Sequence, residues 1–148
     1  MNIEIDQSGR IEVLTVDTAF GFSNRRQSAI LVPVAVKRQV SGQLHARGVR
    51  PKLVSVRMFA ASLFLLLEDH LSQIDLLTID REFPGWEPVI KGFLLDHIRS
   101  RYEWFPTDAI AFGEIGKASR AHEVAWRTYR GERPAEKVIT SSQLLKRC

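Results

Sequence analysis

Residues 74–80 have the sequence Ile-Asp-Leu-Leu-Thr-Ile-Asp, a short apolar run that ends on an acid. Strands that are buried between helices have such near-continuous apolar sequences, whereas strands with one wet face alternate. We therefore expect these residues to form a central strand that is buried on both faces. Asp80 then lies where this strand ends.

Helical patterns flank this strand on both sides. Pro51 suits the first turn of a helix, and from Leu53 to Leu71 apolar residues recur at steps of three and four. Additional apolar residues in that stretch predict burial of the helix on more than one side. After a turn at residues 83–85, residues 86–102 have the pattern of a second helix.

The alternation continues to the end of the chain. Residues 108–113 predict a further strand, and Ser119 can cap a third helix. Residues 138–140 predict a last short strand, and Ser141 starts a small terminal helix. Because strands alternate with helices, the second half of the chain predicts parallel strands with helices packed on the sheet faces.

The first half of the chain has a different pattern. Residues 11–16 are alternating and β-branched, and residues 29–36 form a second apolar run, so the two predict a hairpin. Pro33 lacks an N–H and belongs at an edge or a bulge. Residues 39–50 are polar and predict a mobile basic loop that can hold a third short strand. The predicted fold class is α/β, a mixed sheet of antiparallel hairpin strands followed by parallel strands, flanked by helices.

Composition narrows the class of protein. The length of 148 residues predicts a single domain over residues 1–148. The first residues lack the basic and apolar regions of a signal peptide, and the most hydrophobic stretch, residues 58–67, is far shorter than the roughly 20 residues that span a bilayer. Cys148 is the only cysteine and receives no role. We expect a soluble, cytoplasmic protein.

The basic residues are unevenly distributed along the chain. No Asp or Glu occurs between Asp17 and Glu68, so this segment predicts a one-sided positive field that attracts polyanions. A solvated basic face with no partner is the alternative. The basic residues of the segment are Arg25, Arg26, Lys37, Arg38, Arg47, Arg50, Lys52 and Arg57.

Asp17 and Asp80 are the strongest candidates for chemistry, because each follows a run of buried-type residues. Ligands are usually held at strand ends in open sheets. Two carboxylates brought together there repel each other, and a divalent cation such as Mg²⁺, which prefers oxygen ligands, removes that cost. Alternatively, each aspartate only caps the turn after its strand.

The order of elements around these acids resembles the RNase H-like nuclease superfamily. In that superfamily the first strand supplies an invariant aspartate, the central strand supplies a second acid, and the last helix supplies a further ligand. The resemblance implies that Asp17 and Asp80 hold Mg²⁺ or Mn²⁺. It extends to small archaeal proteins of this fold that degrade single-stranded DNA and, around residues 116–123, to the crossover-junction resolvases.

The third ligand is left open between His122 and Glu123. Adjacent helical residues point about 100° apart, so only one of them faces the sheet, and we favour His122. Glu82 is a further candidate beside Asp80. Lys117 precedes a helix start, where N–H groups favour anions, and with Arg120 it can hold a phosphate.

The predicted function is a metal-dependent nuclease that hydrolyses phosphodiester bonds, with single-stranded DNA as the favoured substrate and exonuclease action as the favoured mode. The nucleic acid is expected to contact Arg25, Arg26, Arg47, Lys117 and Arg120. Trp86, Trp104 and Trp126 can stack on bases or lie in the core. A non-catalytic nucleic-acid-binding or assembly module is the alternative function, and the apolar helix at residues 58–67 leaves room for a homo-oligomer.

Overall fold

A computed structural model describes residues 1–148 and is built around a six-stranded sheet of order β5-β4-β1-β2-β3-β6. The strands are β1 (Asn2–Ser8), β2 (Thr18–Ser23), β3 (Gln27–Val32), β4 (Leu76–Asp80), β5 (Ile110–Gly113) and β6 (Lys137–Val138). Neighbours in β1–β2–β3 are antiparallel, whereas β4 is parallel to β1, β5 to β4, and β6 to β3. The predicted α/β class with a mixed sheet flanked by helices is confirmed.

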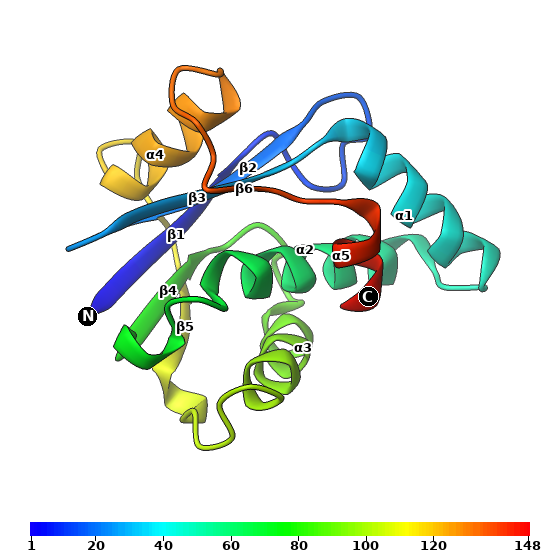
Figure 1. Ribbon diagram of the computed structural model, residues 1–148. Helices are drawn as coiled ribbons and strands as arrows, with labels where there is room; N and C mark the ends of the chain where they lie inside the picture. The colour runs from blue at the N-terminus through cyan, green and yellow to red at the C-terminus, as the bar shows by residue number, and fades with distance from the viewer.

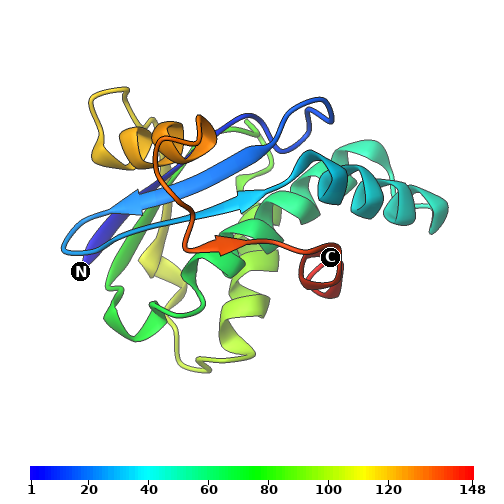
Figure 2. The ribbon, with the colours of Figure 1, turned by 45° about the horizontal axis from the view of Figure 1, so that its top comes forward.

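Five α-helices and two short 3₁₀ turns complete the structure. The helices are α1 (Val34–Ala46), α2 (Pro51–Leu67), α3 (Glu87–Arg99), α4 (Arg120–Tyr129) and α5 (Ser141–Lys146), and the turns are Leu71–Gln73 and Thr107–Ala109. Figure 1 shows α4 alone on one side of the sheet, with α2, α3 and α5 on the other. In Figure 2, α1 projects beyond the end of the sheet. The lone helix α4 packs against β1, β2 and β3.

Helix α2 lies at the centre of the hydrophobic core. It begins at Pro51 as predicted, and its buried residues surround the helix axis, which confirms burial on more than one side. The hydroxyl of Ser62 donates to the Met58 carbonyl at 2.7 Å, so this buried polar group is satisfied within the helix. No helix has both the length and the hydropathy that a membrane span requires.

The second half of the chain follows the predicted order closely. Strand β4 falls within the predicted run, and Ser119 caps α4 by accepting a hydrogen bond from the Ala121 N–H at 3.2 Å. The last strand is residues 137–138 rather than 138–140. One expectation was wrong: in β4 only Leu77 and Ile79 are buried, because α4 covers β1 to β3 and leaves the corresponding face of β4 open.

The first strand lies earlier in the chain than predicted. Residues 2–8 form β1, whereas residues 11–16 form turns instead of a strand. Two side chains of α1 hold this turn segment in place. Lys37 Nζ donates to the carbonyls of Arg10 and Val13 at 3.1 and 2.6 Å, and Arg38 Nε donates to the Leu14 carbonyl at 2.7 Å. In this segment the side chains of α1 bind carbonyls that no neighbouring strand pairs with.

The predicted strand at residues 29–36 and the loop after it are also corrected. Strand β3 ends at Val32, and Pro33 is the N-cap of α1, which replaces the expected loop. The buried side of α1 consists of Lys37, Val40, Ser41 and Leu44, a helical spacing of i, i+3, i+4 and i+7. Because two of these residues are polar, a search for apolar periodicity does not detect the helix.

Gly21 on β2 allows α4 to lie unusually close to the sheet. A Cβ at this position would be 2.9 Å from the Ala125 nitrogen and 3.0 Å from a methyl carbon of Val124. Gly21 pairs with Asp6 of β1, so the close approach occurs beside that acid. A side chain here would push α4 away from the sheet.

We expect Gly21→Ala to lower the free energy of unfolding by about 1–3 kcal/mol, because the new methyl group meets backbone atoms of α4. Gly42→Ala is the matched control. Gly42 lies inside α1 with open space around it, and the alanine should leave stability unchanged or raise it by about 0.5–1 kcal/mol. Urea denaturation measures both, and equal stability of the two variants would contradict the close packing of α4.

Lys37 generates a prediction about pH. Burial lowers the pKa of Lys37 to about 8, with the charges of Asp17 and Glu12 acting in the opposite direction. In the unfolded chain a lysine keeps its proton to about pH 10.4, so between about pH 8 and 10.4 the unfolded state binds more protons. The free energy of unfolding should therefore rise with pH in this window, relative to Lys37→Met. Urea denaturation of both proteins from pH 7.5 to 10.5 tests this, and a pH-independent difference would refute it.

Candidate metal centre

Three carboxylates converge where β1 and β4 approach their carboxyl ends. Parallel pairing places Ile5 opposite Ile79, so Asp6 lies beside Asp80. Glu82 follows β4 by two residues, and oxygens of Asp6, Asp80 and Glu82 all lie within 4.8 Å of one another. We call these three residues the acid cluster. Asp6 is 5% exposed, so one member of the cluster is buried among the strands.

His122 of α4 is paired with the buried member of the acid cluster. Its Nδ1 lies 2.8 Å from Oδ2 of Asp6. When Asp6 is ionised it can only accept, and the imidazole then donates through Nδ1–H and keeps Nε2 for other partners. The contact joins α4 to β1, and it depends on the close approach that Gly21 permits.

The surroundings of the acid cluster oppose ionisation of Asp6 and Glu82. Burial raises the pKa of Asp6, the charge of Asp80 adds to this effect, and the hydrogen bond with His122 opposes it. Burial and the neighbouring Asp80 together raise the pKa of Glu82 to about 8. Asp80 is held in place by the Ile115 N–H, which donates to its Oδ1 at 2.8 Å. A cation at the cluster would favour the ionised form of all three groups.

An open pocket of about 430 Å³ lies over the acid cluster. It forms on the side where α4 leaves β4 uncovered. Its wall combines the three acids and His122 with two basic side chains, those of Arg10 and Lys117, and with the ring of Trp126. The pocket thus places cationic groups around an anionic centre, an arrangement suited to a ligand that is itself anionic and binds through a metal ion.

The donor set of the acid cluster fits a hard divalent cation. Three carboxylates supply only oxygen ligands, which Mg²⁺ and Mn²⁺ prefer. Beside them lies Gln7, which is almost fully buried and interacts with Glu82 so as to lower the pKa of that carboxyl, against the larger effect of burial. His122 is already engaged with Asp6 and lies outside the acid cluster.

Asp17 does not join the acid cluster. It follows the turn segment rather than a strand, and its Oδ1 accepts a hydrogen bond from the Val34 N–H at 2.8 Å. Asp17 therefore satisfies a free N–H at the start of α1. The predicted pairing of Asp17 with Asp80 is corrected: Asp6 lies beside Asp80, because the first strand is residues 2–8.

The side chains of His122 and Glu123 lie on different sides of α4. His122 faces Asp6, whereas Glu123 is exposed and lines a smaller pocket of about 190 Å³ on another side of α4. Arg120 lies in the same smaller pocket, and its other basic members are Arg127 and Arg133. Only the histidine of the two candidates therefore touches the acid cluster.

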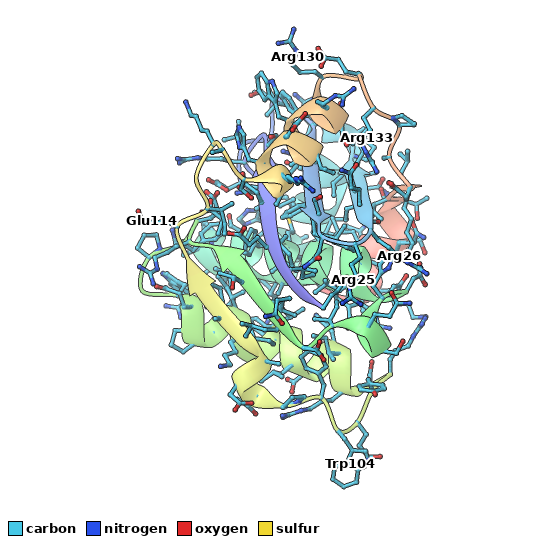
Figure 3. The ribbon with its side chains drawn as sticks, turned by 90° about the vertical axis from the view of Figure 1, so that its left-hand side faces the viewer. Arg25, Arg26, Trp104, Glu114, Arg130 and Arg133 are labelled. Atoms are coloured by element: carbon cyan, nitrogen blue, oxygen red, sulfur yellow. The ribbon has the colours of Figure 1, made fainter.

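The predicted nucleic-acid contacts are scattered over the molecule. Lys117 lines the pocket over the acid cluster, but Arg25 and Arg26 lie in the β2–β3 turn at the opposite end of the strands (Figure 3). Arg47 is the C-cap of α1, and Lys37 is buried. The basic residues of the acid-free segment therefore do not form one surface. Some of them lie on α1, which projects beyond the end of the sheet, and Lys37 is buried.

Sequence reasoning missed Asp6, although a signal was present. Ile3 and Ile5 alternate with polar residues, and the alternation is followed by Asp6 and Gln7, both buried. Only two apolar residues carry this strand pattern, whereas residues 11–16 carry more. The buried polar residues at the end of β1 made the strand look like a surface segment.

The acid cluster generates a prediction about stability. Asp80→Asn removes one of the three carboxylates that would hold a divalent cation. Mn²⁺ at about 100 times its Kd should stabilise the unmodified protein by about 2.7 kcal/mol and the variant much less. Thermal unfolding with EDTA or Mn²⁺ measures the response of both proteins.

Asp17→Asn is the control for this experiment. It changes an equally conspicuous aspartate outside the acid cluster, so the response to Mn²⁺ should equal that of the unmodified protein. A response that is lost in Asp17→Asn and kept in Asp80→Asn would overturn the assignment of the acid cluster.

Comparisons of this chain with protein-family models, with curated proteins and with solved structures found no match. What the site can do is therefore inferred from its own residues: three carboxylates, an imidazole bonded to one of them, and basic and aromatic side chains around an open pocket.

Proposed function

We propose that the protein is a divalent-metal-dependent nuclease that hydrolyses phosphodiester bonds. The observation that carries this proposal is the convergence of Asp6, Asp80 and Glu82 in a pocket with basic walls. A cluster of carboxylates repels a phosphate group unless a cation lies between them. A basic wall without the acid cluster would serve binding alone, so the combination favours catalysis on a phosphodiester.

The resemblance to the RNase H-like superfamily supports the same reading, with one residue exchanged. That resemblance implies an aspartate from the first strand, an acid from the central strand and a ligand or proton carrier from the last large helix. Asp6 of β1, and not Asp17, corresponds to the aspartate of the first strand, and Asp80 of β4 corresponds to the acid of the central strand. His122 of α4 corresponds to the residue from the last large helix. The three positions meet at one pocket, as a shared site requires.

Each residue has a distinct part in the proposed reaction. Asp6, Asp80 and Glu82 would hold Mg²⁺ or Mn²⁺, which would supply activation of a water and neutralise charge on the phosphate. His122 fixes the orientation of Asp6 through Nδ1 and can exchange a proton at Nε2. Lys117 and Arg10 attract the phosphates that flank the scissile bond.

The finer parts of the proposal come from the resemblance. Single-stranded DNA is the favoured substrate, and exonuclease action is the favoured mode. A cytoplasmic location belongs to the proposal as well. So does a possible homo-oligomer, although α2, whose apolar stretch suggested one, is buried within the chain and offers little surface to a second copy.

Asp6→Asn and Asp80→Asn should each lower cleavage of labelled single-stranded DNA more than about 100-fold, because they weaken the hold on a metal that contributes several kcal/mol to the transition state. Asp17→Asn should retain cleavage, since the Asp17 side chain accepts a hydrogen bond from the Val34 N–H at the start of α1 and lies outside the acid cluster. Gel assays with single-stranded and duplex DNA and RNA, in Mg²⁺, Mn²⁺ or EDTA, measure the effects.

Two outcomes would count against the proposal. Salt-sensitive binding without metal-dependent turnover would identify a non-catalytic nucleic-acid-binding module. Cleavage that depends on Asp17 and survives the loss of Asp6 would place the reaction elsewhere in the molecule.

A further inference from the structure

Trp126 is an exposed aromatic residue at the wall of the proposed active site. Its side chain projects from α4, one turn after His122, and it lines the same pocket as the acid cluster. The residue is 43% exposed, so much of the ring is in contact with water. Burial in the core, the ordinary role of a tryptophan, does not account for this position.

The ring is supported from behind. Tyr129 stacks on Trp126 with centroids 6.0 Å apart and an interplanar angle of 20°. Tyr129 in turn packs on Gly9, where a Cβ would lie 2.6 Å from the tyrosine ring. Gly9 follows β1 directly and has a φ of +72°, which few other residues adopt. The two rings therefore form a platform anchored to the end of the strand that carries Asp6.

The surroundings of the platform are cationic. The Arg130 guanidinium lies 5.4 Å from the centroid of the Trp126 ring, and Arg10 and Lys117 line the pocket beside it. A planar apolar surface between basic groups matches one repeating unit of a nucleic acid, which pairs a flat base with a phosphate. A bare phosphate would not use the ring.

The other tryptophans lack these features. Trp86 packs against the hydrophobic core. Trp104 is 85% exposed but has no aromatic or cationic partner, and Figure 3 shows it at the end of the molecule opposite to Arg130 and Arg133. Trp126 is thus the one tryptophan that adjoins the acid cluster, and Trp104 supplies a matched control.

We propose that Trp126, backed by Tyr129, stacks an unpaired base of the strand whose phosphate lies at the acid cluster. The inference rests on the proposed nuclease function and deepens it, because it assigns the preference for single strands to a specific side chain. In a duplex the bases already stack on one another, and their faces cannot reach the ring. A single strand offers each base face to the platform.

Binding to an oligothymidylate and to an abasic oligonucleotide of the same length tests the proposal. Both are measured on the unmodified protein with Ca²⁺ in place of Mg²⁺, over times too short for the strand to be consumed, so that the acid cluster keeps its three carboxylates and an oxygen-bound cation. Trp126→Ala should weaken binding of the oligothymidylate about 10-fold and leave the abasic strand unaffected. Trp126→Phe should retain most of the affinity, and Trp104→Ala should bind both strands as the parent does.

A second measurement keeps Trp126 in place and so does not depend on the folding of the alanine variant. With Trp86 and Trp104 both replaced by phenylalanine, the fluorescence of Trp126 should be quenched by the oligothymidylate and not by the abasic strand. Quenching by both strands, or by neither, would overturn the stacking proposal.

The outcomes separate the two proposals. If Trp126→Ala binds both strands as the parent does while cleavage still requires Asp6 and Asp80, stacking is refuted and the nuclease function stands. If base-dependent binding is lost in Trp126→Ala but no metal supports cleavage, stacking stands and the nuclease function fails. A parent protein that binds neither strand refutes both.

Discussion

The parallel pairing of β1 with β4 is the constraint on which the proposed site depends. With Ile5 opposite Ile79, the next residues are Asp6 and Asp80, and this register brings their carboxylates together. A shift of one residue would turn one acid to the other face of the sheet. Burial, together with the neighbouring Asp80, raises the pKa of Asp6 and of Glu82, so keeping these groups ionised costs free energy. Groups with perturbed pKa values are typical of functional sites.

The second constraint is the distance of α4 from the sheet. Gly21 has no side chain to hold α4 away from the sheet, so His122 of α4 can reach Asp6 of β1. The same placement over β1, β2 and β3 leaves β4 uncovered, so the pocket opens above Asp80 and Glu82. The placement of α4 thus accounts for the contact of the His122 imidazole with Asp6, for the access to the acid cluster and for the exposure of Trp126.

The sequence predicted the second half of the fold well and the first half poorly, for a physical reason. From Pro51 onward the elements bury apolar faces, and their periodicity is visible in the residue types. In the first half, buried positions hold Asp6, Gln7, Lys37 and Ser41, whose polarity disguises the strand and the helix that contain them. The stretch at residues 11–16 has the residue types of a strand, yet the side chains of Lys37 and Arg38 bind its carbonyls.

The sequence by itself determined the α/β class, the central strand that ends at Asp80, and the helix that carries His122, because these follow from local patterns of apolar residues. Only the tertiary structure decided which aspartate stands beside Asp80, since that depends on strand register and not on residue type. It also decided the separate surroundings of His122 and Glu123, and the place of Trp126 at the pocket wall. Neighbours brought together from distant parts of the chain set the chemistry of each group, and no local pattern records them.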